Sequence, residues 1–152
     1  MGRLGVTNLD CRQDGAALDP ALGRSSYLFN ATVAGIEQAD ALMIIGANPR
    51  KEAPVLNARI RKRWRAGKFP IALIGERADL TFDYNYLGAG PETLGGLKGG
   101  ELGKAERPLW LIGQGALARP DGAAVLALAA RAAQAAGAIK DCLLYTSDAA
   151  DE

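Results

Sequence analysis

The sequence predicts an α/β fold, a parallel sheet flanked by helices. A short apolar run ends at a glycine three times, at Gly46, Gly75 and Gly113, and runs of this kind are typical of buried strands. Helical patterns follow the first and the third run, so strands and helices alternate along the chain. This alternation favours a parallel sheet with right-handed crossovers. The length of 152 residues suits one domain, and an apolar content of 49% is enough for a core.

The first strand and the turn after it are the centre of the predicted fold. Residues 42–45 read LMII, and the polar residues 47–50 (ANPR) predict a turn directly after Gly46. Open α/β sheets bind ligands beyond the carboxyl ends of their strands. The turn therefore lies where a ligand is expected.

A helix is expected next, over about residues 54–64. Pro54 suits a first helical turn because its missing N–H has no partner there, and the carboxylate of Glu52 lies near the positive end of the helix dipole. Three apolar residues recur at every fourth position and share one face, which needs a packing partner. They are Leu56, Ile60 and Trp64.

The remaining elements rest on weaker local signals. They are a helix over 32–39 with Thr32 as its cap, a strand over 71–74, a weak helix over 91–97, a strand over 108–112 and a helix over 122–136. The rest of residues 76–100 is glycine-rich and predicts a loop, and residues 5–10 predict a short strand or a loop.

Charge and composition argue against several kinds of function. The net charge of +1 does not favour strong attraction to nucleic acid, and the absence of a long apolar run excludes a membrane-spanning helix. The chain has no histidine, and its two cysteines, Cys11 and Cys142, stand far apart. A metal site within this chain is therefore not expected.

The three strand ends that are followed by a glycine could support ligand binding rather than catalysis. Together they could form a shallow trough that accepts a nucleotide-like ligand on backbone N–H groups. However, Gly113-Gln114-Gly115 lacks the third glycine of a dinucleotide fingerprint, and no phosphate-loop motif is present. We therefore interpret these glycines mainly as residues that the turns require, and only secondly as parts of a binding site. Loop carboxylates at Glu76, Asp79 and Asp83 are interpreted as solvated.

The predicted helix over residues 53–65 also carries a run of basic side chains. These are Arg59, Arg61, Lys62, Arg63 and Arg65. They surround the sides of the helix that the apolar face leaves free. Two interpretations remain open: a solvated surface, and a surface that meets acidic groups of a partner subunit.

Three segments resemble a known family. They are residues 30–40 (NATVAGIEQAD), 45–50 (IGANPR) and 52–62 (EAPVLNARIRK), with support from 8–13, 72–75, 79–81, Tyr84 and 119–124. Together they resemble the large iron–sulfur subunit of respiratory complex I, which occurs in bacterial NADH-quinone oxidoreductase and, as the 75 kDa subunit, in mitochondria. The resemblance covers about residues 5–139, in a carboxyl-terminal domain similar to the molybdopterin oxidoreductase fold.

The resemblance implies a structural role within NADH:quinone oxidoreductase, a complex that passes electrons from NADH to quinone. This segment would hold no cofactor, while the full-length subunit would carry 2Fe-2S and 4Fe-4S clusters upstream. Its partners would be other peripheral-arm subunits, on the cytoplasmic side of the bacterial inner membrane.

The alternative is a piece of a molybdopterin-dependent oxidoreductase such as a formate dehydrogenase. Relatives that bind the pterin have a Gly-x-Asn-Pro turn where this chain has residues 46–49, so Gly46, Asn48, Gly75 and Gly113 would then line the cofactor. Arg50 follows that turn here, as in the complex I subunit, and favours the first interpretation.

The two ends of the chain differ in expected origin. Residues 1–141 are expected to be part of a molybdopterin-oxidoreductase-like domain within a longer protein. Residues 142–152 (CLLYTSDAADE) look like the translation of a sequencing-library adapter. We expect this tail to be non-native, so that Cys142 has no functional role.

Overall fold

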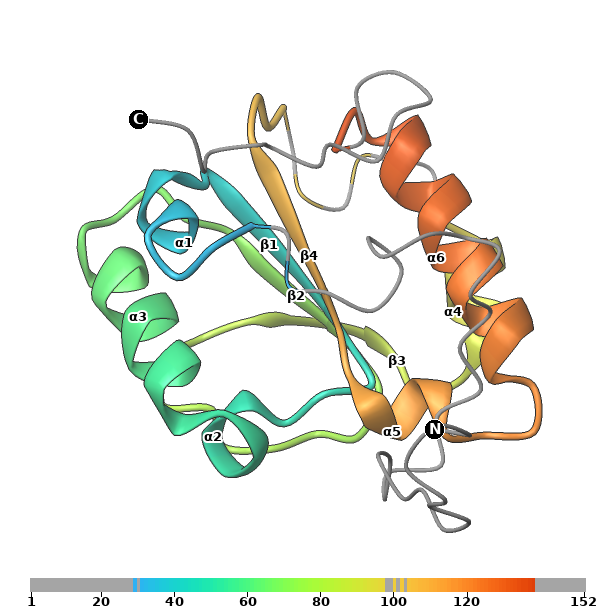
Figure 1. Cartoon of the computed structure of the whole chain (residues 1–152). Coiled ribbons are helices and arrows are strands. Elements are labelled where there is room, and N and C mark those ends of the chain that lie inside the picture. The colour runs from blue at the N-terminus through green and yellow to red at the C-terminus, as the bar shows by residue number, and fades with distance from the viewer. Residues whose placement is uncertain (1–28, 30, 98–99, 101, 103, 139–152) are drawn as a thin grey trace, which may run out of the picture.

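The computed structural model describes residues 29, 31–97, 100, 102 and 104–138. Within these residues, four parallel strands form one sheet with helices against both faces (Figure 1). In sheet order the strands are β3 (Asn85–Gly88), β2 (Ile71–Ile74), β1 (Ala41–Ile45) and β4 (Pro108–Ile112). The predicted α/β fold with a parallel sheet is confirmed.

β1 is central in this sheet and is the most deeply buried strand. All five of its residues are buried. Leu42 is paired with Ile71 of β2 on one side and with Leu109 of β4 on the other. A strand covered on both faces has no polar face, which explains why its sequence is a continuous apolar run.

The helices form two layers. On one face of the sheet lie α1 (Gly35–Gln38), α2 (Pro49–Glu52) and α3 (Pro54–Arg65), while α4 (Pro91–Gly95) and α6 (Gly122–Ala135) cover the other face (Figure 1). The short α5 (Gln114–Leu117) begins just beyond β4 and packs on α6. None of these helices in the described part of the chain is long and apolar enough to cross a membrane.

The predicted apolar face of α3 is confirmed. Ile60 is 1% exposed, and Leu56 and Trp64 pack half-buried against the same cluster, which includes Ile44 and Leu73 of the sheet. Apolar burial of this kind is the main force that fixes a helix on a sheet.

The predicted turn over residues 47–50 is wrong in its second half, because α2 begins at Pro49. Asn48 caps this short helix: its Oδ1 accepts a hydrogen bond from Lys51 N at 3.3 Å. Glu52, expected at the start of α3, instead turns back, and its Oε1 accepts a hydrogen bond from Asn48 N at 2.5 Å. This reciprocal pair satisfies two amide groups that a helix end would otherwise leave free.

Other boundaries also differ from the prediction. The helix expected over 32–39 is only α1, although Thr32 Oγ1 does accept a hydrogen bond from Gly35 N at 3.0 Å. The weak helix over 91–97 is found as α4, and the helix over 122–136 as α6. β3 and α5 were not predicted. The expectations for residues 5–10, Cys11, Cys142 and the tail 142–152 lie outside the described residues.

Candidate functional site

The carboxyl ends of the strands meet at one edge of the sheet, and their glycines contact one another there. Gly46 N donates to Ile74 O at 2.8 Å, and Gly113 N donates to Ile45 O at 2.8 Å. Gly75 N donates to Gly88 O at the same distance. The three glycines singled out in the sequence are therefore neighbours in space.

Two of these positions need glycine for space as well as for the turn. Gly46 has φ +56°, and a Cβ there would lie 2.6 Å from Cβ of Ala116. A Cβ on Gly113 would lie 2.4 Å from the carbonyl oxygen of Gly46 and 2.7 Å from Cα of Ala47. Backbone segments pack directly on each other here, as the structural interpretation of these glycines requires.

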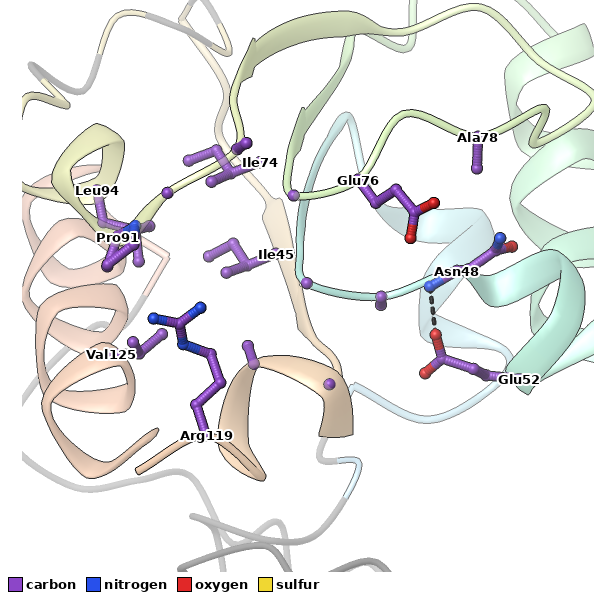
Figure 2. Close-up of a pocket in the computed structure, with 17 residues that line it drawn as sticks. Ile45, Asn48, Glu52, Ile74, Glu76, Ala78, Pro91, Leu94, Arg119 and Val125 are labelled. Atoms are coloured by element: carbon purple, nitrogen blue, oxygen red, sulfur yellow. Dashed lines mark hydrogen bonds between the residues drawn. The ribbon is translucent and has the colours of Figure 1, made fainter. Parts of the chain in front are cut away.

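A cavity of about 320 Å³ opens at this edge (Figure 2). Its size is at the lower end of the range of about 300–1,000 Å³ for small-molecule pockets. Of the four residues in the cofactor-binding alternative, Gly46, Asn48 and Gly75 line the cavity; Gly113 does not, and Gly115 does. The sequence did not predict the apolar residues of the cavity or Arg119 as site residues. Glu76 was interpreted only as a solvated loop residue, although its position directly after the predicted strand 71–74 indicates this edge of the sheet.

The cavity has two chemically different halves (Figure 2). One half is formed by apolar side chains of β1, β2, α4 and α6 and also contains the side chain of Arg119. The apolar side chains are those of Ile45, Ile74, Pro91, Leu94 and Val125. In the other half, Glu52 and Glu76 lie on either side of Asn48. Both carboxylates are exposed, so this half is an acidic rim rather than a buried charge site.

Among the described residues, the only basic side chain that lines this cavity is that of Arg119, and it is already paired. Its Nε donates to Oδ1 of Asp121 at 2.7 Å, and its Nη2 donates to Oδ2 at 2.8 Å. This double hydrogen bond raises the pKa of Arg119, with a further contribution from the charge of Glu92, and it lowers the pKa of Asp121. Arg119 therefore brings little net positive charge to the cavity.

Glu76, Asp79 and Asp83 are exposed, as the sequence interpretation expects, but Asp79 also holds the loop after β2 against the helices. The Asp79 carboxylate pairs with Arg50 of α2 and also accepts a hydrogen bond from Thr81 N at 2.9 Å. The Thr81 amide, followed by the Arg50 guanidinium, lowers the pKa of Asp79. The buried Asn57 Nδ2 donates to Leu80 O at 3.2 Å. These contacts fix the loop that carries Glu76.

Four of the five basic side chains of α3 are exposed, as the solvated interpretation expects, but three of the five also form contacts within the molecule. Arg59 and Lys62 both pair with Glu37 of α1, at 2.5 Å and 2.8 Å. Arg63 Nε donates to Ala39 O at 2.8 Å, and its guanidinium stacks on the ring of Phe69. Three of the five cations thus tie α3 to its neighbours, and only Arg61 and Arg65 form no such contact with a described residue.

The pairing of Glu37 predicts a specific pH dependence. Lys62 first, and then Arg59, lower the pKa of this carboxylate below its ordinary value of 4.5. A depressed folded-state pKa stabilises the fold fully above the ordinary value, and this contribution is lost as pH falls through the folded-state pKa. We expect Glu37→Gln to reduce stability at pH 7 and to bring the variant and wild type together in acid. Urea midpoints between pH 7 and pH 3 would measure this, with Asp83→Asn as the control; a constant difference across that range would contradict it.

Comparison with known proteins identifies the family. A sequence model of the family described as molybdopterin oxidoreductase matches residues 1–144. The chain belongs to this family. It is 41% identical over 132 residues to a subunit of the NADH-quinone oxidoreductase of Rickettsia bellii, covering 83% of this chain and 19% of that protein.

Two mitochondrial proteins extend the similarity. The chain is 42% identical over 96 residues to the NADH-ubiquinone oxidoreductase 78 kDa subunit of Neurospora crassa, covering 60% of this chain and 13% of that protein. It is also 42% identical over 109 residues to the 78 kDa subunit of Candida albicans, covering 69% and 15%. The resemblance predicted from the sequence is confirmed. The chain spans less than a fifth of the length of these relatives.

The family name implies a pterin cofactor that carries a phosphate group. The residues that line the cavity show how well such a group would fit there. The glycines at this edge pack on one another and on Ala116, so the space that they leave is filled by the protein itself. In addition, the amide of Asn48 already donates to Glu52, the second rim carboxylate is Glu76, and Arg119 is neutralised by Asp121. An anionic group would therefore meet two like charges and, among the described residues that line the cavity, no free cation. We infer that this cavity does not fit such a cofactor.

Proposed function

We propose that this chain is a structural segment of the large iron–sulfur subunit of NADH:quinone oxidoreductase. The observation that carries the proposal is the 41% identity to the Rickettsia bellii subunit over 83% of this chain. The acidic rim of the cavity supports it, because it disfavours the alternative of a pterin-dependent enzyme such as a formate dehydrogenase. In this role the segment supports electron transfer from NADH to quinone without supplying a catalytic residue.

The finer features of the proposal concern the whole subunit. Its 2Fe-2S and 4Fe-4S clusters would be bound outside this segment, upstream of it. Among the described residues, no three His, Cys, Asp or Glu side chains gather in a way that could hold a metal ion. The subunit would lie in the peripheral arm, against other subunits of the complex, on the cytoplasmic side of the bacterial inner membrane. Residues 1–141 would form the native part of the segment and residues 142–152 a non-native tail.

The test uses the full-length subunit that contains this segment. An affinity-tagged copy, expressed with the other subunits, should migrate with NADH:quinone oxidoreductase activity on native gels and show the signals of reduced iron–sulfur clusters. The same preparation should contain no stoichiometric molybdenum. Molybdenum together with formate-dependent activity, in place of NADH oxidation, would establish the alternative.

A further inference from the structure

We propose that the outer edge of β4 pairs with a further strand, parallel to β4, and that this strand comes from the part of the subunit's own chain that follows α6. The inference concerns this edge of the sheet and not the cavity. It goes beyond the proposed function, because it needs only a chain that continues after α6. The matched region makes up between 13% and 19% of the relatives, so most of such a subunit lies outside it.

The backbone of β4 offers hydrogen-bonding groups on the side that faces away from β1. Gly113 N donates to Ile45 O at 2.8 Å, so the odd-numbered residues of β4 turn their backbone groups toward β1. Neighbouring residues of a strand direct these groups to opposite sides. The N–H and C=O groups of Trp110 and Ile112 therefore point outward. Within the described residues β4 pairs with β1 alone, so these outward groups have no strand partner there.

The sequence of β4 is that of an interior strand. It reads PLWLI, an apolar run without a charge, yet all five residues are only half-buried, whereas those of β1 are fully buried. Edge strands are normally protected by short length, polar residues or a bulge. β3, at the other edge, has four residues, an exposed Asn85 and an irregular register with β2. β4 has only Pro108, at the first position, which interior strands also tolerate.

A buried donor on the same strand also lacks an acceptor. The indole Nε1 of Trp110 is buried and donates to no described residue. The Trp110 side chain packs on the cluster that includes Leu94 of α4 and Val125 of α6, so it lies on the face of the sheet that these helices cover. A buried N–H group without an acceptor is costly. We therefore expect a segment beside β4 on this face to supply one.

The course of the chain indicates which segment this is. α4 lies between β3 and β4 in the chain and on the same face as α6 (Figure 1), and that connection crosses the sheet from β3 to β4. α6 begins near the carboxyl end of β4 and runs back along the sheet (Figure 1). A connection through α6 that continues in the same direction has the same hand, and parallel crossovers share one hand. Because β1 occupies the other side of β4, the strand that follows α6 is expected at the free edge, parallel to β4.

The first experiment identifies the neighbour of β4 and its direction. Photoreactive benzoylphenylalanine replaces Arg107 or Gln114, exposed residues that flank the two ends of β4, in the full-length subunit purified with its complex. We expect both probes to react with one segment that follows α6 in the same chain, the Arg107 probe nearer the amino end of that segment. The same probe at Asn85, in the β3 edge, should not react with it. Reaction with residues 1–28, a second copy or another subunit, the reverse order, or no product would overturn the inference.

The second experiment tests the pairing itself by hydrogen exchange of single amides, read by mass spectrometry of the same preparation. The outward amides of Trp110 and Ile112 should exchange as slowly as the inward amides of Leu109 and Leu111, about a hundredfold or more below the rate of an open strand edge. Fast exchange at Trp110 and Ile112 would show that this edge is open and would reject the inference. Neither outcome depends on which complex contains the subunit, so the proposed function is tested separately.

Discussion

Replacing Gly113 by alanine is expected to destabilise the fold by about 3 kcal/mol, the upper part of the range for overpacked positions. The new Cβ would lie 2.4 Å from the carbonyl oxygen of Gly46 and 2.6 Å from Cβ of Ala47. Backbone atoms cannot rotate away as a flexible side chain can, so β4 must separate from the end of β1. The hydrogen bond from Gly113 N to Ile45 O, 2.8 Å long, would be strained by the same movement.

The measurement is the free energy of unfolding in urea, followed by circular dichroism. Gly95→Ala is a matched control, because a Cβ at Gly95 would meet, beyond its own helix backbone and chain neighbours, no atom of the described residues within 4 Å. It lies in α4, where alanine is favoured over glycine, so a small gain of up to about 1 kcal/mol is expected. A wild-type midpoint for Gly113→Ala would show that the strand ends have more freedom than the structure implies.

Much of the fold could be predicted because burial leaves a clear pattern in the sequence. β1, β2 and β4 appear as continuous apolar runs, and the first two are buried along their whole length. The apolar face of α3 was found because its side chains recur at helical spacing. Gly137, with φ +72°, follows the end of the last helix, close to the predicted boundary at residue 136.

β3 and α5, which were not predicted, lack such a pattern of apolar residues. β3 reads NYLG and begins with the exposed Asn85, so no periodicity distinguishes it from the surrounding loop. β3 is defined by its pairing with β2, and this tertiary contact leaves no pattern in the sequence. α5 has only four residues and includes Gly115, a composition that predicts a loop.

The sequence predicted where the candidate site lies, but it did not predict which chemical groups line it. Strand-closing glycines indicated the correct edge of the sheet, because carboxyl ends of parallel strands lie together. The apolar wall could not be predicted, since Leu94 and Val125 come from helices whose placement depends on tertiary packing. The pairing of Arg119 with Asp121 is close in sequence, yet only the structure shows that this charge does not serve the cavity.

Replacing Ile60 by alanine is expected to cost about 2–5 kcal/mol, the usual range for an isoleucine removed from a core. Ile60 is 1% exposed and joins α3 to the cluster that contains Leu42, Ile44 and Leu73. The ion pairs of Arg59 and Lys62 with Glu37 are exposed, so we expect them to stabilise α3 less than the burial of Ile60 does.

Val55→Ala is the matched control for Ile60→Ala. Val55 lies in the same helix, is β-branched like isoleucine and is 68% exposed, so its truncation changes α3 in a similar way without removing a buried side chain. Its free energy of unfolding should stay within about 0.5 kcal/mol of the wild type. Similar losses for both variants would mean that helix formation itself, rather than packing on the sheet, limits stability. A large loss for Ile60→Ala alone would show that packing of the apolar face on the sheet is a main source of stability for α3.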